Sequence, residues 1–87
     1  MPLVELFGQA RALAGTSSVE VEAGTVAQAL AALAVQFPSL VGPVLDLDGG
    51  VTPAYTLNLD GKRFLRDLDE LLQPDDRLLI FSTLSGG

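Results

Sequence analysis

The chain has 87 residues, 48% of them hydrophobic, and a formal charge of −6 from 11 acidic and 5 basic residues. This length predicts one domain with a modest core, and the acidic balance argues against the basic face that nucleic-acid binding normally requires. Cysteine and histidine are both absent, which excludes thiol nucleophiles, imidazole bases and the usual zinc ligands, and so argues against a self-sufficient enzyme.

The sequence also lacks the signals of a membrane or secreted protein. No apolar run reaches the roughly 18 residues needed to span a bilayer, and the N-terminus has no basic start followed by a long apolar stretch. Without cysteine no disulfide can form. We therefore expect a cytoplasmic protein with no membrane and no nucleic-acid partner. Its acidic surface suits a basic protein partner, although solubility alone would also explain the charge.

The N-terminal part predicts two strands joined by a short helix. Residues 3–7 are mostly apolar and predict a strand. Residues 9–14 are helix formers that end at Gly15, a residue typical of helix C-termini, so one or two helical turns fit there. Residues 18–22 alternate polar and apolar and predict a half-buried strand. The short connection predicts that the two strands pair antiparallel, with the acidic side in water.

The clearest helix begins after Thr25. This threonine is a good N-cap, and Gln28 three residues later completes a capping box. Pro38 ends the helix, because a residue before proline is pushed out of the α region. One apolar stripe follows the helical spacing i, i+4, i+7 and i+11: Val26, Leu30, Leu33 and Phe37. We expect this stripe to face the core rather than a partner, since no other predicted helix is long enough to cover a sheet.

Residues 39–53 combine serine, glycine, proline and aspartate and predict a mobile linker, with at most a helical turn around Val44 and Leu45. The carboxylates there lack the spacing and the bidentate glutamate of a calcium-binding EF-hand loop, so we predict no metal site.

The second half predicts a hairpin and a final strand. Residues 54–59 alternate as a strand, Asp60-Gly61 is a two-residue hairpin signal, and residues 62–65 would return antiparallel. The spacing of Leu68, Leu71 and Leu72 predicts a helical turn packed on the core.

The last strand, residues 77–81, is continuously apolar, which predicts burial on both faces and a central place in the sheet. It can reach the centre only by inserting parallel to the first strand, with the long helix crossing one face. We therefore predict an α+β fold of the β-grasp (ubiquitin-like) type. Residues 1–87 form a single domain with a mixed sheet of four to five strands, one long helix packed on one face, and a free, flexible C-terminal tail over residues 82–87.

Small residues dominate the chain after Phe81. The tail residues are Thr83, Leu84, Ser85, Gly86 and Gly87. Two terminal glycines lack a Cβ, so they can thread into a slot too narrow for side chains. Chain termini are often rich in small residues without any function. Composition alone therefore leaves two interpretations of the tail open: a segment that threads into a partner, and an ordinary terminus.

The sequence resembles the MoaD/ThiS sulfur-carrier family, in particular the small subunit of molybdopterin synthase. The resemblance covers the whole chain. It rests on residues 6–15, on the helix that opens at Thr25-Val26 and closes at Phe37-Pro38, on residues 74–77, and on the terminal Gly86-Gly87. It departs from that branch at residues 82–85, where a proline-containing run is more common, so the family is indicated more strongly than the branch.

The resemblance implies a carrier without its own catalytic side chains and without a cofactor of its own. An adenylating activating enzyme would use ATP to adenylate the Gly87 carboxylate, and a persulfide sulfur would displace AMP to leave a thiocarboxylate. The tail would then enter the large subunit of molybdopterin synthase and give sulfur to the pterin precursor. The alternatives are a carrier for thiamine, cysteine or tRNA thiolation, a modifier joined to lysines, and a plain binding module.

Docking on such partners is expected to use an apolar patch on the sheet face away from the helix. The candidates are Phe7, Leu59, Phe64 and Phe81, for each of which ordinary core packing is the alternative. Phe81 is preferred because it lies beside the tail. Arg11 is a candidate for pairing with an acidic partner, and a plain exposed helix residue is the alternative.

Overall fold

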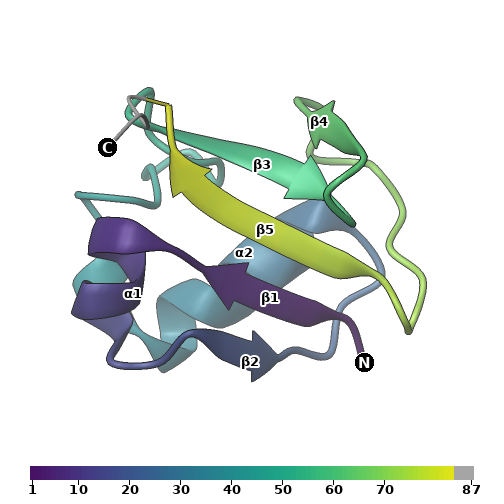
Figure 1. Cartoon of the computed structure of the whole chain (residues 1–87), viewed down its shortest axis with the longest axis horizontal. Helices are drawn as coiled ribbons and strands as arrows, with labels where there is room; N and C mark the ends of the chain where they lie inside the picture. Colours follow the sequence, from purple (N-terminus) through teal and green to yellow (C-terminus); the bar gives the residue numbers. More distant parts are fainter. Residues whose placement is uncertain (84–87) are drawn as a thin grey trace.

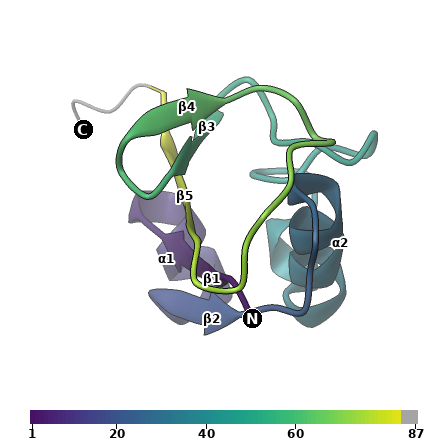
Figure 2. The same ribbon diagram turned by 90° about the vertical axis from the view of Figure 1, so that its right-hand side faces the viewer.

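The computed structural model of the protein describes residues 1–83, whose strands form one five-stranded mixed sheet in the order β2-β1-β5-β3-β4 (Figure 1). The strands are β1 (Leu3–Leu6), β2 (Ser18–Glu20), β3 (Tyr55–Leu59), β4 (Arg63–Leu65) and β5 (Arg77–Ser82). The helices are α1 (Gly8–Ala14), α2 (Val26–Gln36) and the short 3-10 helix η1 (Pro38–Leu40). Figure 2 shows α2 on one side of the sheet.

Strand β5 is the centre of the sheet. It pairs parallel with β1, where Leu6 lies opposite Ile80, and antiparallel with β3, where Leu57 lies opposite the same residue. Strands β1 and β2 pair antiparallel. The predicted β-grasp fold is therefore confirmed, including the insertion of the last strand beside the first.

The prediction that β5 is buried on both faces is wrong. Leu78 and Ile80 are fully buried, whereas Leu79 and Phe81 on the opposite face are only half-buried. Successive side chains of a strand point to opposite faces, and the core with α2 covers only the face of Leu78 and Ile80. Continuous apolar sequence in β5 therefore leaves an apolar surface on the outer face of the sheet.

The core lies between the sheet and α2. Its largest fully buried side chains come from β1, α2, β5 and the segment after α2: Val4, Leu6, Val26, Leu30, Leu33, Leu40, Val44, Leu78 and Ile80. The apolar stripe predicted for the helix faces this core, with Phe37 partly buried against it. The threonine cap is also confirmed, because Thr25 Oγ1 accepts a hydrogen bond from the Gln28 amide at 3.2 Å. Gln28 Oε1 in turn accepts from the Gly24 amide at 2.7 Å.

The segment after η1 is not the linker predicted from its composition. Val44 and Leu45 are buried in the core, and the Val44 amide donates to the Leu40 carbonyl at 3.0 Å. The helical turn expected around Val44 and Leu45 lies earlier, in η1. The composition of this segment is typical of a loop, but its buried apolar residues anchor it to the core.

The helical turn predicted around Leu68, Leu71 and Leu72 is also wrong. Leu72 is buried and Leu68 is half-buried, but Leu71 is 67% exposed, and no helix forms between β4 and β5. The physical reason is a competing use of the backbone. The first amides of α2, those of Val26 and Ala27, donate to the carbonyls of Glu70 and Leu68 at 3.0 and 2.9 Å. These amides have no partner within their own helix.

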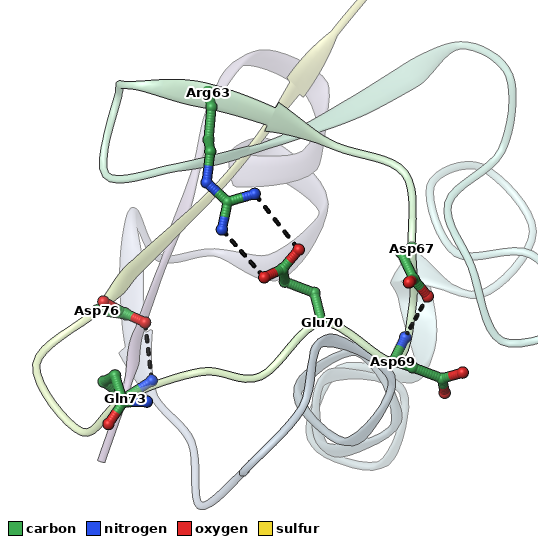
Figure 3. Close-up of polar contacts among 6 residues, drawn as sticks. All are labelled: Arg63, Asp67, Asp69, Glu70, Gln73 and Asp76. Carbon is green, nitrogen blue, oxygen red and sulfur yellow. Dashed lines mark hydrogen bonds and ion pairs between the residues drawn. The ribbon is translucent and has the colours of Figure 1, made fainter.

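The segment therefore closes the N-terminus of α2 instead of forming a helix of its own. In Figure 2 it runs from β4 to α2 before returning to β5. Figure 3 shows three polar contacts along it: Arg63 with Glu70, the Asp69 amide with Asp67, and the Gln73 amide with Asp76. The hydrogen bonds to Glu70, and next its charge, raise the pKa of Arg63 above its ordinary value. Both side chains of this pair are partly exposed, so it adds little stability.

The hairpin turn between β3 and β4 is built on Asp60 and Gly61, which both have positive φ, 57° and 73°. The Lys62 amide closes the turn on the Leu59 carbonyl at 2.9 Å. These are the signs of the primed turn that the sequence predicts. Asp60 also clamps the turn to β5, since its Oδ1 accepts from the Arg77 amide at 2.8 Å and its own amide donates to the Arg77 carbonyl at 2.8 Å.

We expect Asp60→Ala to lower the free energy of unfolding by about 1 kcal/mol, because the Arg77 amide loses its acceptor and alanine tolerates positive φ poorly. Urea denaturation followed by circular dichroism measures this. Asp60→Asn is the matched control, since asparagine keeps an acceptor oxygen and adopts left-handed backbone more readily. Equal losses in the two variants would contradict the assigned role of the side-chain oxygen.

Candidate functional site

The end of β5 is where the chain leaves the sheet. Ser82 still pairs with Tyr55 in the ladder. Thr83 is held twice, since its amide donates to the Ala54 carbonyl at 2.9 Å and its Oγ1 donates to the Pro53 carbonyl at 3.2 Å. Residues 82 and 83 therefore belong to the folded body, and the predicted tail of residues 82–87 begins two residues too early. Its remaining residues, Leu84, Ser85, Gly86 and Gly87, lie outside the described part of the chain.

Three phenylalanines gather beside this exit, on the sheet face away from α2. The ring centroids of Phe7 and Phe81 are 6.3 Å apart in an edge-to-face arrangement, and those of Phe64 and Phe81 are 6.0 Å apart. Phe7 is 39% exposed, Phe64 is 64% exposed and Phe81 is half-buried between them. We call these three residues the phenylalanine patch. The structure thus brings together three of the four apolar side chains selected from the sequence.

The fourth candidate, Leu59, does not belong to the patch. It is 9% exposed and forms part of the core, where its strand register places it opposite Leu78. The reason is the two-residue period of a strand. Leu57 and Leu59 share the face of β3 that looks toward α2, so the patch face of β3 carries Thr56 and Asn58 instead.

Arg11 lies on the exposed side of α1. Within residues 1–83 its side chain forms no ion pair. A shallow hollow lies beside it, lined by Gly8, Ala12 and Gly15 among others. An exposed position on α1 fits Arg11 both as a plain surface residue and as a contact for a partner.

Charges also border the outer face of the sheet. Arg77 Nε donates to Glu5 Oε2 at 2.7 Å across the parallel pair of β1 and β5. Glu5 lies opposite Leu79, and these two residues come two positions before Phe7 and Phe81 on the same face, so this ion pair lies next to the patch along β1 and β5. Among residues 1–83 no group of three or more acidic side chains is placed to hold a metal ion. The same residues contain no helix with the length and apolar character to cross a membrane.

Two structural features of this site were not found by sequence reasoning. One is the double anchor of Thr83, for which no sequence signal existed because its partners are carbonyls of the distant Pro53-Ala54 turn. The other is Asn58, which is 6% exposed on the patch face. Its alternation with Leu57 and Leu59 was a usable signal, since it places Asn58 on the face opposite to theirs.

The fold and this site define a class: ubiquitin-like β-grasp proteins in which a central last strand leads directly into a small-residue C-terminus. The chain matches the ThiS family model over residues 4–87, and it belongs to the ThiS family of small ubiquitin-like sulfur carriers and modifiers. No curated protein matches it by sequence.

Solved structures of similar proteins share this fold. The chain is 29% identical to SAMP1 from Haloferax volcanii, with a TM-score of 0.82 over 99% of this chain and 98% of that one. It is 16% identical to a chain of the BexX/CysO complex from Amycolatopsis orientalis, with a TM-score of 0.83 and full coverage of both chains. A putative molybdopterin converting factor subunit 1 from Pyrococcus furiosus is 22% identical, with a TM-score of 0.68 over 93% and 94% of the two chains.

Proposed function

We propose that the protein is a sulfur carrier whose Gly87 carboxylate is adenylated and converted to a thiocarboxylate, and that it donates sulfur for molybdopterin biosynthesis as the small subunit of molybdopterin synthase. Family membership supports the carrier role. The observation that carries the proposal is the position of Thr83. It is anchored at the end of the central strand, four residues before Gly87.

The chemistry needs only the terminal carboxylate from this chain. A C-terminal carboxylate has a reference pKa of about 3.3–3.7, so it is ionised at neutral pH and is a poor electrophile. Adenylation by an activating enzyme uses ATP, releases pyrophosphate and forms a mixed anhydride. A persulfide sulfur then attacks the carbonyl carbon and displaces AMP, and reduction of the resulting acyl disulfide by a thiol leaves the thiocarboxylate. This agrees with a chain that lacks cysteine and histidine.

The geometry limits where a partner can receive the tail. Four extended residues span at most about 13–14 Å, so the reactive slot of a partner must lie within that distance of Thr83. The phenylalanine patch begins two residues away, at Phe81. A partner that covers this patch can therefore place its slot within reach of Gly87. We assign this docking mode to the activating enzyme and to the large subunit of molybdopterin synthase.

Incubation of the protein with the activating enzyme, ATP and a sulfur donor is expected to increase its intact mass by about 16 Da, because one oxygen is replaced by sulfur. Intact-mass spectrometry measures this gain. Omission of ATP is the control and should leave the mass unchanged. A chain that gains no sulfur with any cognate activating enzyme would contradict every carrier interpretation. Capture of the large subunit of molybdopterin synthase, rather than a thiazole synthase, would support the molybdopterin branch over the thiamine branch.

A second candidate function is conjugation to lysines. The observation that favours it is the similarity to SAMP1, a small archaeal modifier protein, over nearly the full length of both chains. The activation step is the same, but a lysine amine would attack the acyl-adenylate in place of sulfur. Higher-mass conjugates that persist under denaturing conditions would support this candidate, and a thiocarboxylate without such conjugates would support the carrier.

A further inference from the structure

A buried hydrogen-bond acceptor without a partner lies beneath the phenylalanine patch. Asn58 is the polar side chain found buried among residues 1–83, at 6% exposure. Its Oδ1 accepts no hydrogen bond from any residue in that part of the chain. Buried polar atoms are almost always paired, since an unpaired one has lost its water without replacement.

Strand register places Asn58 beside one of the aromatic residues and one pair away from another. It lies on β3, with Leu79 of β5 as its neighbour on one side and Phe64 of β4 on the other. Phe81 lies one pair further along, opposite Thr56. Strands two places apart in a sheet are separated by about 9.5 Å, but the ring centroids of Phe64 and Phe81 are only 6.0 Å apart. The two rings therefore lean toward each other over β3 and shield Asn58 from water.

Nothing in residues 1–83 uses this oxygen. On an apolar face an aliphatic side chain would fill the same place without leaving an acceptor unpaired. The asparagine therefore lowers the stability of the free protein. The ring above it, that of Phe64, is 64% exposed, and an exposed aromatic side chain changes rotamer readily. A partner that displaces this ring gains access to the acceptor beneath.

We propose that Asn58 Oδ1 is a recognition point for the activating enzyme, which presents an apolar surface carrying one hydrogen-bond donor to this position. The inference rests on the proposed function, because it takes the phenylalanine patch as the docking surface. The acceptor makes the patch selective. An apolar surface without a donor leaves Asn58 buried and unpaired in the complex, whereas a surface with a correctly placed N–H or O–H satisfies it.

The test is ATP-dependent adenylation of the Asn58→Leu variant by the enzyme that activates the wild-type chain. The KM for the carrier is expected to rise about five-fold with kcat unchanged, the size of one lost hydrogen bond. The free variant is expected to melt at a higher temperature than the wild type, because the unpaired acceptor is gone. A purely structural role would move the melting temperature and leave KM unchanged, and that result would overturn the proposal.

Thr56→Val is the matched control, since it makes a polar-to-apolar change on the same face of the same strand and is expected to leave KM unchanged. An equal rise in KM for Thr56→Val would also overturn the proposal. Asn58→Ala gives the same comparison if Asn58→Leu does not fold. If no enzyme adenylates the wild type, the carrier function itself fails and this inference with it. If the wild type is adenylated and both Asn58 variants match it, only the role of Asn58 is lost.

Discussion

Deleting Gly87 is expected to abolish thiocarboxylate formation while leaving the melting temperature of the protein unchanged. The deletion moves the terminal carboxylate back by one residue, about 3.3–3.6 Å along an extended chain. A misplacement of about 1 Å at a reacting group can already reduce the rate about 100-fold. The folded body should not respond, since its last hydrogen bonds within residues 1–83 are those of Thr83. Intact-mass spectrometry and thermal unfolding measure the two effects.

Adding residues after Gly87 should have the same effect, because the new terminus carries the carboxylate and Gly87 becomes an unreactive amide. The same tag placed before Met1 is the control. Met1 is 58% exposed, so a tag there should affect neither folding nor activation. A C-terminally extended protein that stays fully active without being trimmed would show that the terminal carboxylate is not the reacting group.

Leu78→Ala is expected to have the largest effect on stability, with a loss of about 3 kcal/mol in the free energy of unfolding. Leu78 is completely buried in the central strand, between Val4 of β1 and Leu59 of β3, so its truncation leaves a cavity that three strands would have to close. A small domain has only about 5–15 kcal/mol of stability in total. The melting temperature should therefore fall by about 10 °C or more.

Leu47→Ala is the matched control for this change, because it removes the same atoms from a side chain that is 89% exposed. Its melting temperature should remain close to that of the wild type. Guanidinium denaturation of both variants gives the comparison. Similar losses at the two positions would mean that the core does not lie between the sheet and α2 as described.

Much of the fold could be predicted because its signals are local. The cap at Thr25, the apolar stripe of α2, the positive φ of Asp60 and Gly61, and the end of α1 at Gly15 each depend on residues within a few positions of one another. The central place of β5 followed from its continuous apolar sequence, and the β-grasp topology followed from that place. The presence of a glycine-rich terminus is likewise a property of the sequence alone.

The errors arose where a distant segment competed for the same groups. Leu68 and Glu70 were expected in a helical turn, but their carbonyls accept from the first amides of α2. Leu59 was expected in the patch, but the register of β3 against β5 turns it toward the core. In both cases the local pattern allowed two outcomes, and a partner remote in sequence selected one.

The sequence by itself determined that this chain is a small acidic β-grasp domain ending in two glycines, because turn residues, helix caps and apolar periodicity act over short distances along the chain. Only the tertiary structure decided which apolar side chains remain outside, that Ser82 and Thr83 are still held by the body, and that Asn58 Oδ1 lies unpaired on the face that carries Phe64 and Phe81. The reason is that exposure and hydrogen-bond pairing are settled between strands, and neighbours across a sheet come from opposite ends of the sequence.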